Sequence, residues 1–144
     1  MSAQSGAEAG RHLQLALKFL EEGKANREEP RAGERETVQS GGEAVKAPAV
    51  ALDLEQAKAA ARKGGWRAKL LNRAAEAAAE KLGTEELALW WKAAYHLHVE
   101  GSHEARLESE DVKRNLKYVK AIVHTAEKLK PPPNTPENRR PEAA

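Results

Sequence analysis

The sequence predicts an all-α protein, a small antiparallel bundle of four to five helices with a disordered, Pro-rich C-terminal tail. Alanine, the strongest helix former, occurs 28 times in 144 residues. Aromatic residues make up only 4% of the chain and there is one isoleucine, which leaves little material for a β-sheet. Apolar residues also recur at helical spacing in several stretches that end at glycine.

Composition divides the chain into one folded region and two flexible ends. We expect a flexible N-terminus at 1–10, a single helical domain at 11–130 and a disordered tail at 131–144. Proline-rich sequence in the tail removes backbone donors and cannot continue a helix. Within the domain, 24–36 carries four positive and four negative charges with almost no apolar side chain, so we expect a solvated loop there.

The first half of the domain gives one clear helix and one weak one. Residues 11–23 place apolar side chains at helical spacing and end at a glycine. In the next segment Ser40 and Glu43 form a capping box, but two glycines and Pro48 interrupt the interior. A cleaner helix is expected at 54–63. We therefore expect a short second helix and a poorly formed first hairpin.

The second half predicts three well-defined helices. The first two span 66–82 and 84–101, the latter with Leu87, Trp91 and Ala94 on its apolar face. The third begins at Ser109 and shows an apolar stripe formed by Val112, Leu116, Val119, Val123 and Ala126. A separate basic line lies about 120° away at 100° per residue, and consists of Lys113, Lys117, Lys120, His124 and Lys128.

Several function classes find no support in the sequence. Without cysteine there is no disulfide scaffold, thiolate metal site or Cys nucleophile. We find no Gly-rich phosphate loop, Ser-based triad or paired-carboxylate signature, and we expect no cofactor. No apolar run approaches a membrane span, and the start lacks the regions of a signal peptide, so we expect a cytoplasmic protein without a membrane partner. The net charge of +2 does not by itself identify a partner.

The histidines suggest a metal site that helix geometry disfavours. His96 and His98 differ by about 200° around a helix, so they cannot ligate one ion together. His98 falls on the apolar face, and we expect it to be a buried, hydrogen-bonded structural residue. A site made by His98, His103 and Glu104 stays open as an alternative, but we predict no metal ligand.

The strongest positive signal is a basic surface. Residues 56–75 contain six Lys or Arg and no acid. Arg62 and Lys63 suit the end of their helix, whereas Arg67 and Lys69 begin the next helix, where the dipole disfavours cations. An anionic partner such as a nucleic acid would explain them, and Lys113, Lys117 and Lys120 could extend the binding surface. A solvated, charge-rich surface is the other interpretation, and Trp66 fits either the core or a base-stacking role.

Self-association is a second hypothesis about partners. The aliphatic seam of the predicted bundle is narrow, and a short first hairpin would leave apolar surface uncovered. We therefore expect a homodimer.

Residues 65–129 carry a family resemblance. The carrying residues are Gly65-Trp66, Leu70-Leu71, Trp91 through Ala94, LHVEGSHEARL at 97–107, Glu110, Val112 and KYV at 117–119. With weaker matches upstream at Val38-Gln39 and 43–47, this sequence resembles the first PaREP family of thermophilic archaea, which is grouped with HEPN-like helical domains. The resemblance implies a fold and a cell type, but no established activity.

Two function classes follow. Active HEPN-like RNases use an Arg followed after four to six residues by a His, and none of the eleven arginines here has that spacing. His103 and Arg106 occur in the reverse order and, with Glu104, remain weak catalytic candidates. We therefore favour a non-enzymatic interaction or RNA-binding module over an atypical HEPN-like ribonuclease.

Overall fold

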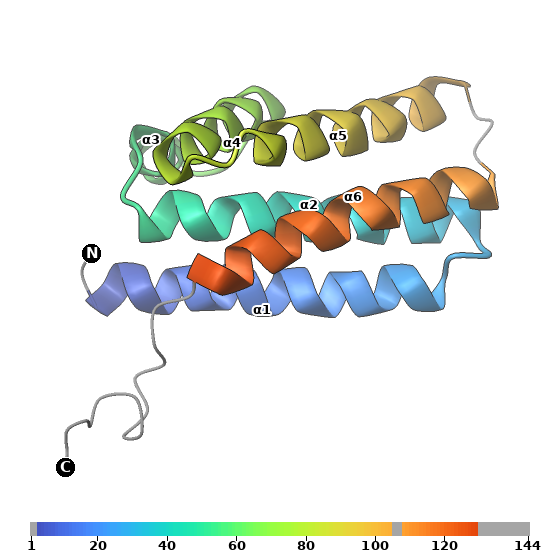
Figure 1. The fold of residues 1–144 in the computed structure, drawn as a ribbon, viewed down its shortest axis with the longest axis horizontal. Coiled ribbons are helices and arrows are strands. Elements are labelled where there is room, and N and C mark those ends of the chain that lie inside the picture. The colour runs from blue at the N-terminus through green and yellow to red at the C-terminus, as the bar shows by residue number, and fades with distance from the viewer. Residues whose placement is uncertain (1–2, 105–107, 130–144) are drawn as a thin grey trace, which may run out of the picture.

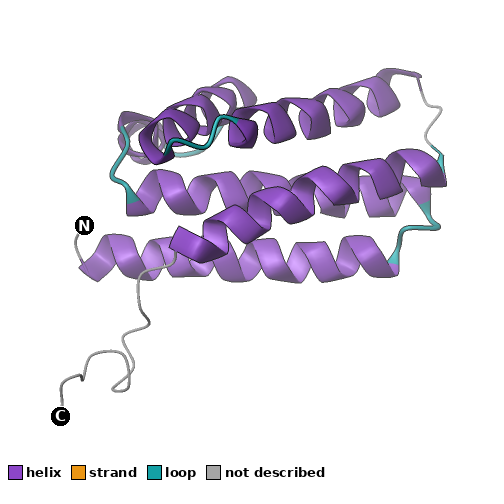
Figure 2. Cartoon of the chain, viewed as in Figure 1, coloured by secondary structure: helices purple, strands orange, loops and turns teal. Residues whose placement is uncertain are grey.

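The computed structural model describes residues 3–104 and 108–129, which form six α-helices and no strand (Figures 1 and 2). The helices are α1 (Ala3–Ala25), α2 (Pro30–Ala51), α3 (Glu55–Lys63), α4 (Ala68–Leu82), α5 (Glu86–Glu104) and α6 (Ser109–Leu129). The all-α prediction is confirmed. The expectation of four to five helices is wrong, because the weak segment before residue 54 forms a complete helix, α2, in addition to the helix expected at 54–63, which is α3.

Helix α2 is the centre of the molecule. It contacts each of the other five helices, and 13 of its 22 residues are buried. Figure 1 shows α1 along one side of α2, α4 and α5 along the other, and α6 crossing in front. Within the described residues α1 has no contact with α4 or α5. Helix α6 therefore covers one face of α2. The opposite face of α2 is open between α1 and the α4–α5 pair.

Small residues in α2 allow this central position. Ser40 Oγ donates a hydrogen bond of 2.6 Å to the carbonyl oxygen of Ala16 in α1. A Cβ at Gly41 would lie 3.2 Å from both the Trp91 ring and a Val119 methyl group. The predicted interruption of this helix at its glycines and Pro48 is wrong, because the gain from close packing on several sides exceeds the low helix propensity of these residues.

The N-terminal segment is helical from Ala3 onward, earlier than the sequence pattern indicates. Helix α1 begins there, eight residues before the predicted start. Ala9 is 4% exposed and lies where α1 passes the last turns of α2 and α6. Burial against two other helices explains the order that composition alone does not indicate.

The charged loop predicted at 24–36 is much shorter than expected. Only residues 26–29 are non-helical, and Pro30 takes the first position of α2, where its missing N–H is not needed. The turn is tight, since a Cβ at Gly33 would lie 2.6 Å from the carbonyl oxygen of Asn26. Glu34 and Thr37 are buried while Arg31 and Arg35 are exposed, so this charge-rich sequence is the start of an amphipathic helix.

The later helices follow the sequence pattern more closely. Gly64 and Gly83 end α3 and α4 in the left-handed conformation, with φ of 76° and 67°. Helix α5 continues three residues past the predicted end at Gly101. The five residues of the predicted stripe on α6 are all buried. No helix in the described ranges is long and apolar enough to cross a membrane, and the predicted tail at 131–144 lies outside those ranges.

Candidate functional site

The predicted basic residues gather at one corner of the fold, where α3 ends and α4 begins. This α3–α4 corner consists of Trp66 and the cations Arg62, Lys63, Arg67, Lys69 and Arg73. The five cations are exposed, and none forms an ion pair within the described part of the chain. By contrast, the neighbouring Lys58 lies 3.5 Å from Glu55. The corner is therefore a concentration of uncompensated positive charge.

Backbone geometry adds to the positive potential of the corner. Gly64 ends α3, and the N–H of Gly65 bonds to the carbonyl oxygen of Ala60 at 2.9 Å. Helix α4 then begins without a side-chain cap and without an acidic residue in its first turn. Its unpaired N–H groups and the positive end of its dipole thus lie beside Arg67 and Lys69. An anion placed here would be stabilised by both.

Trp66 lies in the short connection between the two helices. It is partly buried and packs against the hydrophobic core. The residue is not fully buried, and the next residue in the chain, Arg67, is exposed. The packing fits the core interpretation of Trp66, and the incomplete burial is compatible with the base-stacking interpretation.

The basic line on α6 is a separate surface. Lys113, Lys117 and Lys120 are exposed as predicted, but Lys113 lies 3.6 Å from Glu28 and 3.9 Å from Glu110. Among the described helices, α6 packs on α1, α2 and α5. Leu82 lines a pocket with α6 residues, but it lies at the opposite end of α4 from Arg67 and Lys69. The two basic sets therefore do not form one continuous patch.

The structure places His98 differently from the sequence prediction. Its neighbours on the apolar face, Leu87, Trp91 and Ala94, are buried as expected, and His96 is exposed. The His98 side chain is 33% exposed, because α1 does not cover this part of α5. Its Nδ1 nevertheless points inward and lies 3.4 Å from Glu34 Oε2.

The remaining catalytic and metal candidates are less defined. His103 and Glu104 occupy the last turn of α5, but their side chains lie outside the described part of the structure, as does all of Arg106. Among the described side chains no group of three His, Asp or Glu residues could hold a metal ion.

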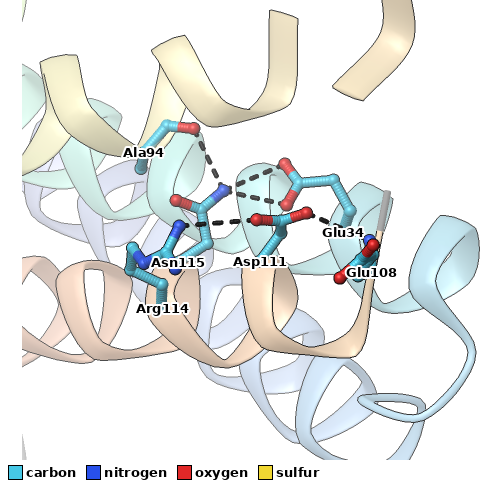
Figure 3. A network of polar contacts seen from close by, with 6 residues as sticks. All are labelled: Glu34, Ala94, Glu108, Asp111, Arg114 and Asn115. Carbon is cyan, nitrogen blue, oxygen red and sulfur yellow. Dashed lines mark hydrogen bonds and ion pairs between the residues drawn. The ribbon is translucent and has the colours of Figure 1, made fainter. Parts of the chain in front are cut away.

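A buried polar network that the sequence did not reveal joins α2, α5 and α6 (Figure 3). Glu34 is 3% exposed and Asn115 is fully buried. Asn115 Nδ2 donates to both Glu34 carboxylate oxygens at 2.9 and 3.0 Å, and to the carbonyl oxygen of Ala94 at 3.1 Å. Asn115 Oδ1 and His98 Nδ1 are buried without a hydrogen-bond partner. The one feature of the sequence that could have indicated this network is the polar residue Asn115 beside the apolar stripe of α6.

A groove of about 410 Å³ lies over the open face of α2. We call it the α2 groove, and its walls come from α1 on one side and from α4 and α5 on the other. Its lining includes Leu15, Phe19, Gly42, Glu43, Lys46, Leu71, Trp91, Tyr95 and His98. The sequence did not predict it, because the groove depends on which helices remain apart.

The Glu43 carboxylate in the floor of the groove contacts two side chains, His12 and Lys46. Its Oε1 lies 2.7 Å from His12 Nδ1 and its Oε2 lies 2.9 Å from Lys46 Nζ. Burial by itself raises the pKa of Glu43, but the hydrogen bonds from His12 and Lys46 outweigh that effect and leave the pKa below the ordinary 4.5. The carboxylate is therefore charged and satisfied within the protein.

Comparison with known proteins identifies one related group. The model of the archaeal PaREP1/PaREP8 family matches residues 6–123, which include α1 through most of α6. No curated protein and no solved structure matches the chain.

Proposed function

We propose that this chain, which belongs to the archaeal PaREP1/PaREP8 family, is a non-enzymatic interaction module that binds single-stranded RNA. The proposed binding surface is the α3–α4 corner. The observation that carries the proposal is the set of five exposed cations there, none of which is paired with a described acid. Phosphate groups would supply the missing counter-charge.

Local stability does not account for these cations. Cations in the first turn of a helix interact unfavourably with its dipole, at a cost of about 0.3–1 kcal/mol each. Arg67 and Lys69 are placed in this way at the start of α4, where the structure has no acid or cap to offset them. A charge-rich surface selected only for solubility would distribute acids among the bases, as α3 does with Glu55 and Lys58.

The geometry favours a single strand over a duplex. Trp66 is only partly buried and stands between Lys63 and Arg67 in the chain, and unpaired bases stack on aromatic rings. Bases in a duplex are stacked on each other and are not available for this contact. The α6 residues Lys117 and Lys120 also flank a partly buried aromatic residue, Tyr118. Because Lys113 on the same line is already close to two acids, we assign α6 a secondary role.

The alternative function is an atypical HEPN-like ribonuclease. One observation favours it, namely the approach of the His98 imidazole to a buried carboxylate, an arrangement that orients a histidine for proton transfer. Cleavage of a phosphodiester also needs a cation at the developing charge. No arginine lines the groove that His98 faces within the described residues, and Lys46 there is bound to Glu43. We therefore rank the nuclease second.

The affinity for fluorescently labelled single-stranded RNA, measured by anisotropy over a range of salt concentrations, tests the proposal. Each phosphate contact contributes about 0.7 to the slope of log affinity against log salt for single strands. Changing Arg62, Arg67 and Lys69 together to Gln should therefore reduce the slope by about 2.

The matched control changes Lys113, Lys117 and Lys120 to Gln, which removes the same charge from α6. Its effect on the slope should be less than half as large. Equal effects of the two triple variants, or an affinity that does not depend on salt, would reject the α3–α4 corner as the binding site.

A further inference from the structure

We propose that the α2 groove is the interface of a homodimer. In this dimer, α1 of each copy lies in the α2 groove of the other copy. This surface is distinct from the α3–α4 corner. Its origin is the separation of α1 from α4 and α5, which leaves the central helix α2 uncovered on one face. A further helix laid in this gap would complete the shell of helices around α2.

The walls of the groove present apolar and aromatic side chains. On the α1 side, Leu15 is 39% exposed and Phe19 is partly buried. On the opposite side, Leu71 and Tyr95 are partly buried, and Tyr95 stacks on Trp91 with ring centroids 5.7 Å apart. A helix laid between these walls would remove this surface from water, and the exposed face of α1 supplies Leu15 and the alkyl stems of Arg11 and Lys18 for this contact.

The polar groups in the floor are already paired with each other. Glu43 is bonded to both His12 and Lys46, so none of the three needs a partner from outside. Covering a charge that is already paired avoids the penalty of burying an isolated ion. The same pairing argues against RNA in the groove, because Lys46 is already neutralised by Glu43.

The exposed face of α1 is complementary to itself. Arg11, Leu15, Lys18 and Glu22 follow at steps of 4, 3 and 4 and so form one line along the helix. Arg11 and Glu22 form no ion pair within the described residues. If two copies of α1 pair antiparallel about a point between Leu15 and Lys18, Arg11 of each copy lies opposite Glu22 of the other.

Self-complementarity of this kind identifies the occupant as a second copy. A two-fold interface brings the same patch of both subunits together, so each contact occurs twice. Here the two ion pairs would flank a centre in which Leu15 of each copy lies opposite the alkyl stem of Lys18 of the other, with Phe19 next to Lys18. Helix α1 is also a wall of the groove, so one symmetry axis can place each α1 in the groove of the other copy.

The first test is the mass of the protein in solution, measured by light scattering over a range of concentrations. The unmodified chain should have the mass of two copies, and Leu15→Lys should have the mass of one. Leu17→Lys is the matched control, because Leu17 is 36% exposed on another side of the same helix. Leu17→Lys should remain dimeric. A monomeric unmodified protein, or equal effects of the two variants, would overturn the proposal.

The second test is a charge exchange that does not depend on a buried position. Arg11→Glu and Glu22→Arg should each weaken the dimer at least tenfold, since like charges would then face each other. The double variant restores opposite charges and should restore the dimer to near the original strength. Failure of the double variant to recover, with helix content unchanged by circular dichroism, would exclude the antiparallel α1 pairing.

Discussion

At the scale of single residues, the most demanding feature is the carboxylate of Glu34. It is buried among three helices, and its described contacts are the Asn115 amide and the His98 ring. A buried carboxylate costs several kcal/mol unless hydrogen bonds and a counter-charge replace water. Asn115 therefore holds α2 to α6 and, through the Ala94 carbonyl, to α5 (Figure 3).

Removing only one member of this network should be strongly destabilising. Asn115→Ala leaves the Glu34 carboxylate without its amide donor, and we expect the free energy of unfolding to fall by about 3 kcal/mol. Urea denaturation at neutral pH measures this. Thr125→Ala, which loses a 3.0 Å hydrogen bond within α6, is the control and should cost about 1 kcal/mol or less.

Changing both partners should separate the network from simple loss of packing. Replacing Glu34 and Asn115 together by Leu removes the buried charge as well as its donor, so this double variant should be more stable than Asn115→Ala. A double variant that is no more stable than the single one would show that the charge of Glu34 is not the reason for the loss.

At the scale of elements, Glu43 links α1 to α2 and gives that contact a pH dependence. Because its pKa is lowered in the folded protein, its contribution is complete above the ordinary 4.5 and is lost as pH falls through the lower folded value. Glu43→Gln should therefore lower the free energy of unfolding by about 1 kcal/mol at neutral pH, and by much less in strong acid.

Denaturation of both proteins at several pH values measures this difference. Glu55→Gln is the control, because the Glu55 side chain is 78% exposed and its pairing with Lys58 should contribute little at any pH. If the difference in the free energy of unfolding between the original protein and Glu43→Gln grew toward low pH, the result would contradict a lowered pKa of Glu43.

Helix α6 could be predicted from the sequence and α2 could not, because the two helices differ in how many of their sides are covered by other helices. An amphipathic helix at the surface has one buried stripe, and the spacing of Val112, Leu116 and Val119 reports it directly. A helix enclosed on several sides needs small residues where neighbours approach, so Gly41 and Ser40 look like helix breakers in the sequence. Only the tertiary contacts show that they are packing positions.

The candidate sites divide in a similar way. The cations of the α3–α4 corner lie close together in the chain, so their clustering was visible in the sequence. The α2 groove and the contact between Glu34 and Asn115 join residues far apart in the chain, 81 positions in the latter case. The prediction of a buried His98 was wrong because helix periodicity indicates a face but not whether another helix covers it.

At the scale of the whole molecule, the fold separates two surfaces with different chemistry. The α3–α4 corner is cationic and unpaired, whereas the α2 groove is apolar with its charges satisfied. Dimerisation through the groove would present two RNA-binding corners on one particle. Linked sites raise the apparent affinity for a strand long enough to reach both.

This assignment also predicts an absence of nuclease activity. Purified protein should not cleave labelled single-stranded RNA above background at neutral pH, because in the α2 groove, where His98 approaches a carboxylate, the cation Lys46 is already bound to Glu43. Cleavage that survives stringent purification and is lost in both His103→Ala and Arg106→Ala would instead place the protein among the enzymes.

The most direct measurement for the RNA-binding surface is ultraviolet cross-linking to single-stranded RNA, with the cross-linked peptides identified by mass spectrometry. The account predicts cross-links within residues 62–73, at Trp66 above all, and their loss when Arg62, Arg67 and Lys69 are changed to Gln. Cross-links concentrated on α6 or in the α2 groove, with none at the α3–α4 corner, would contradict it.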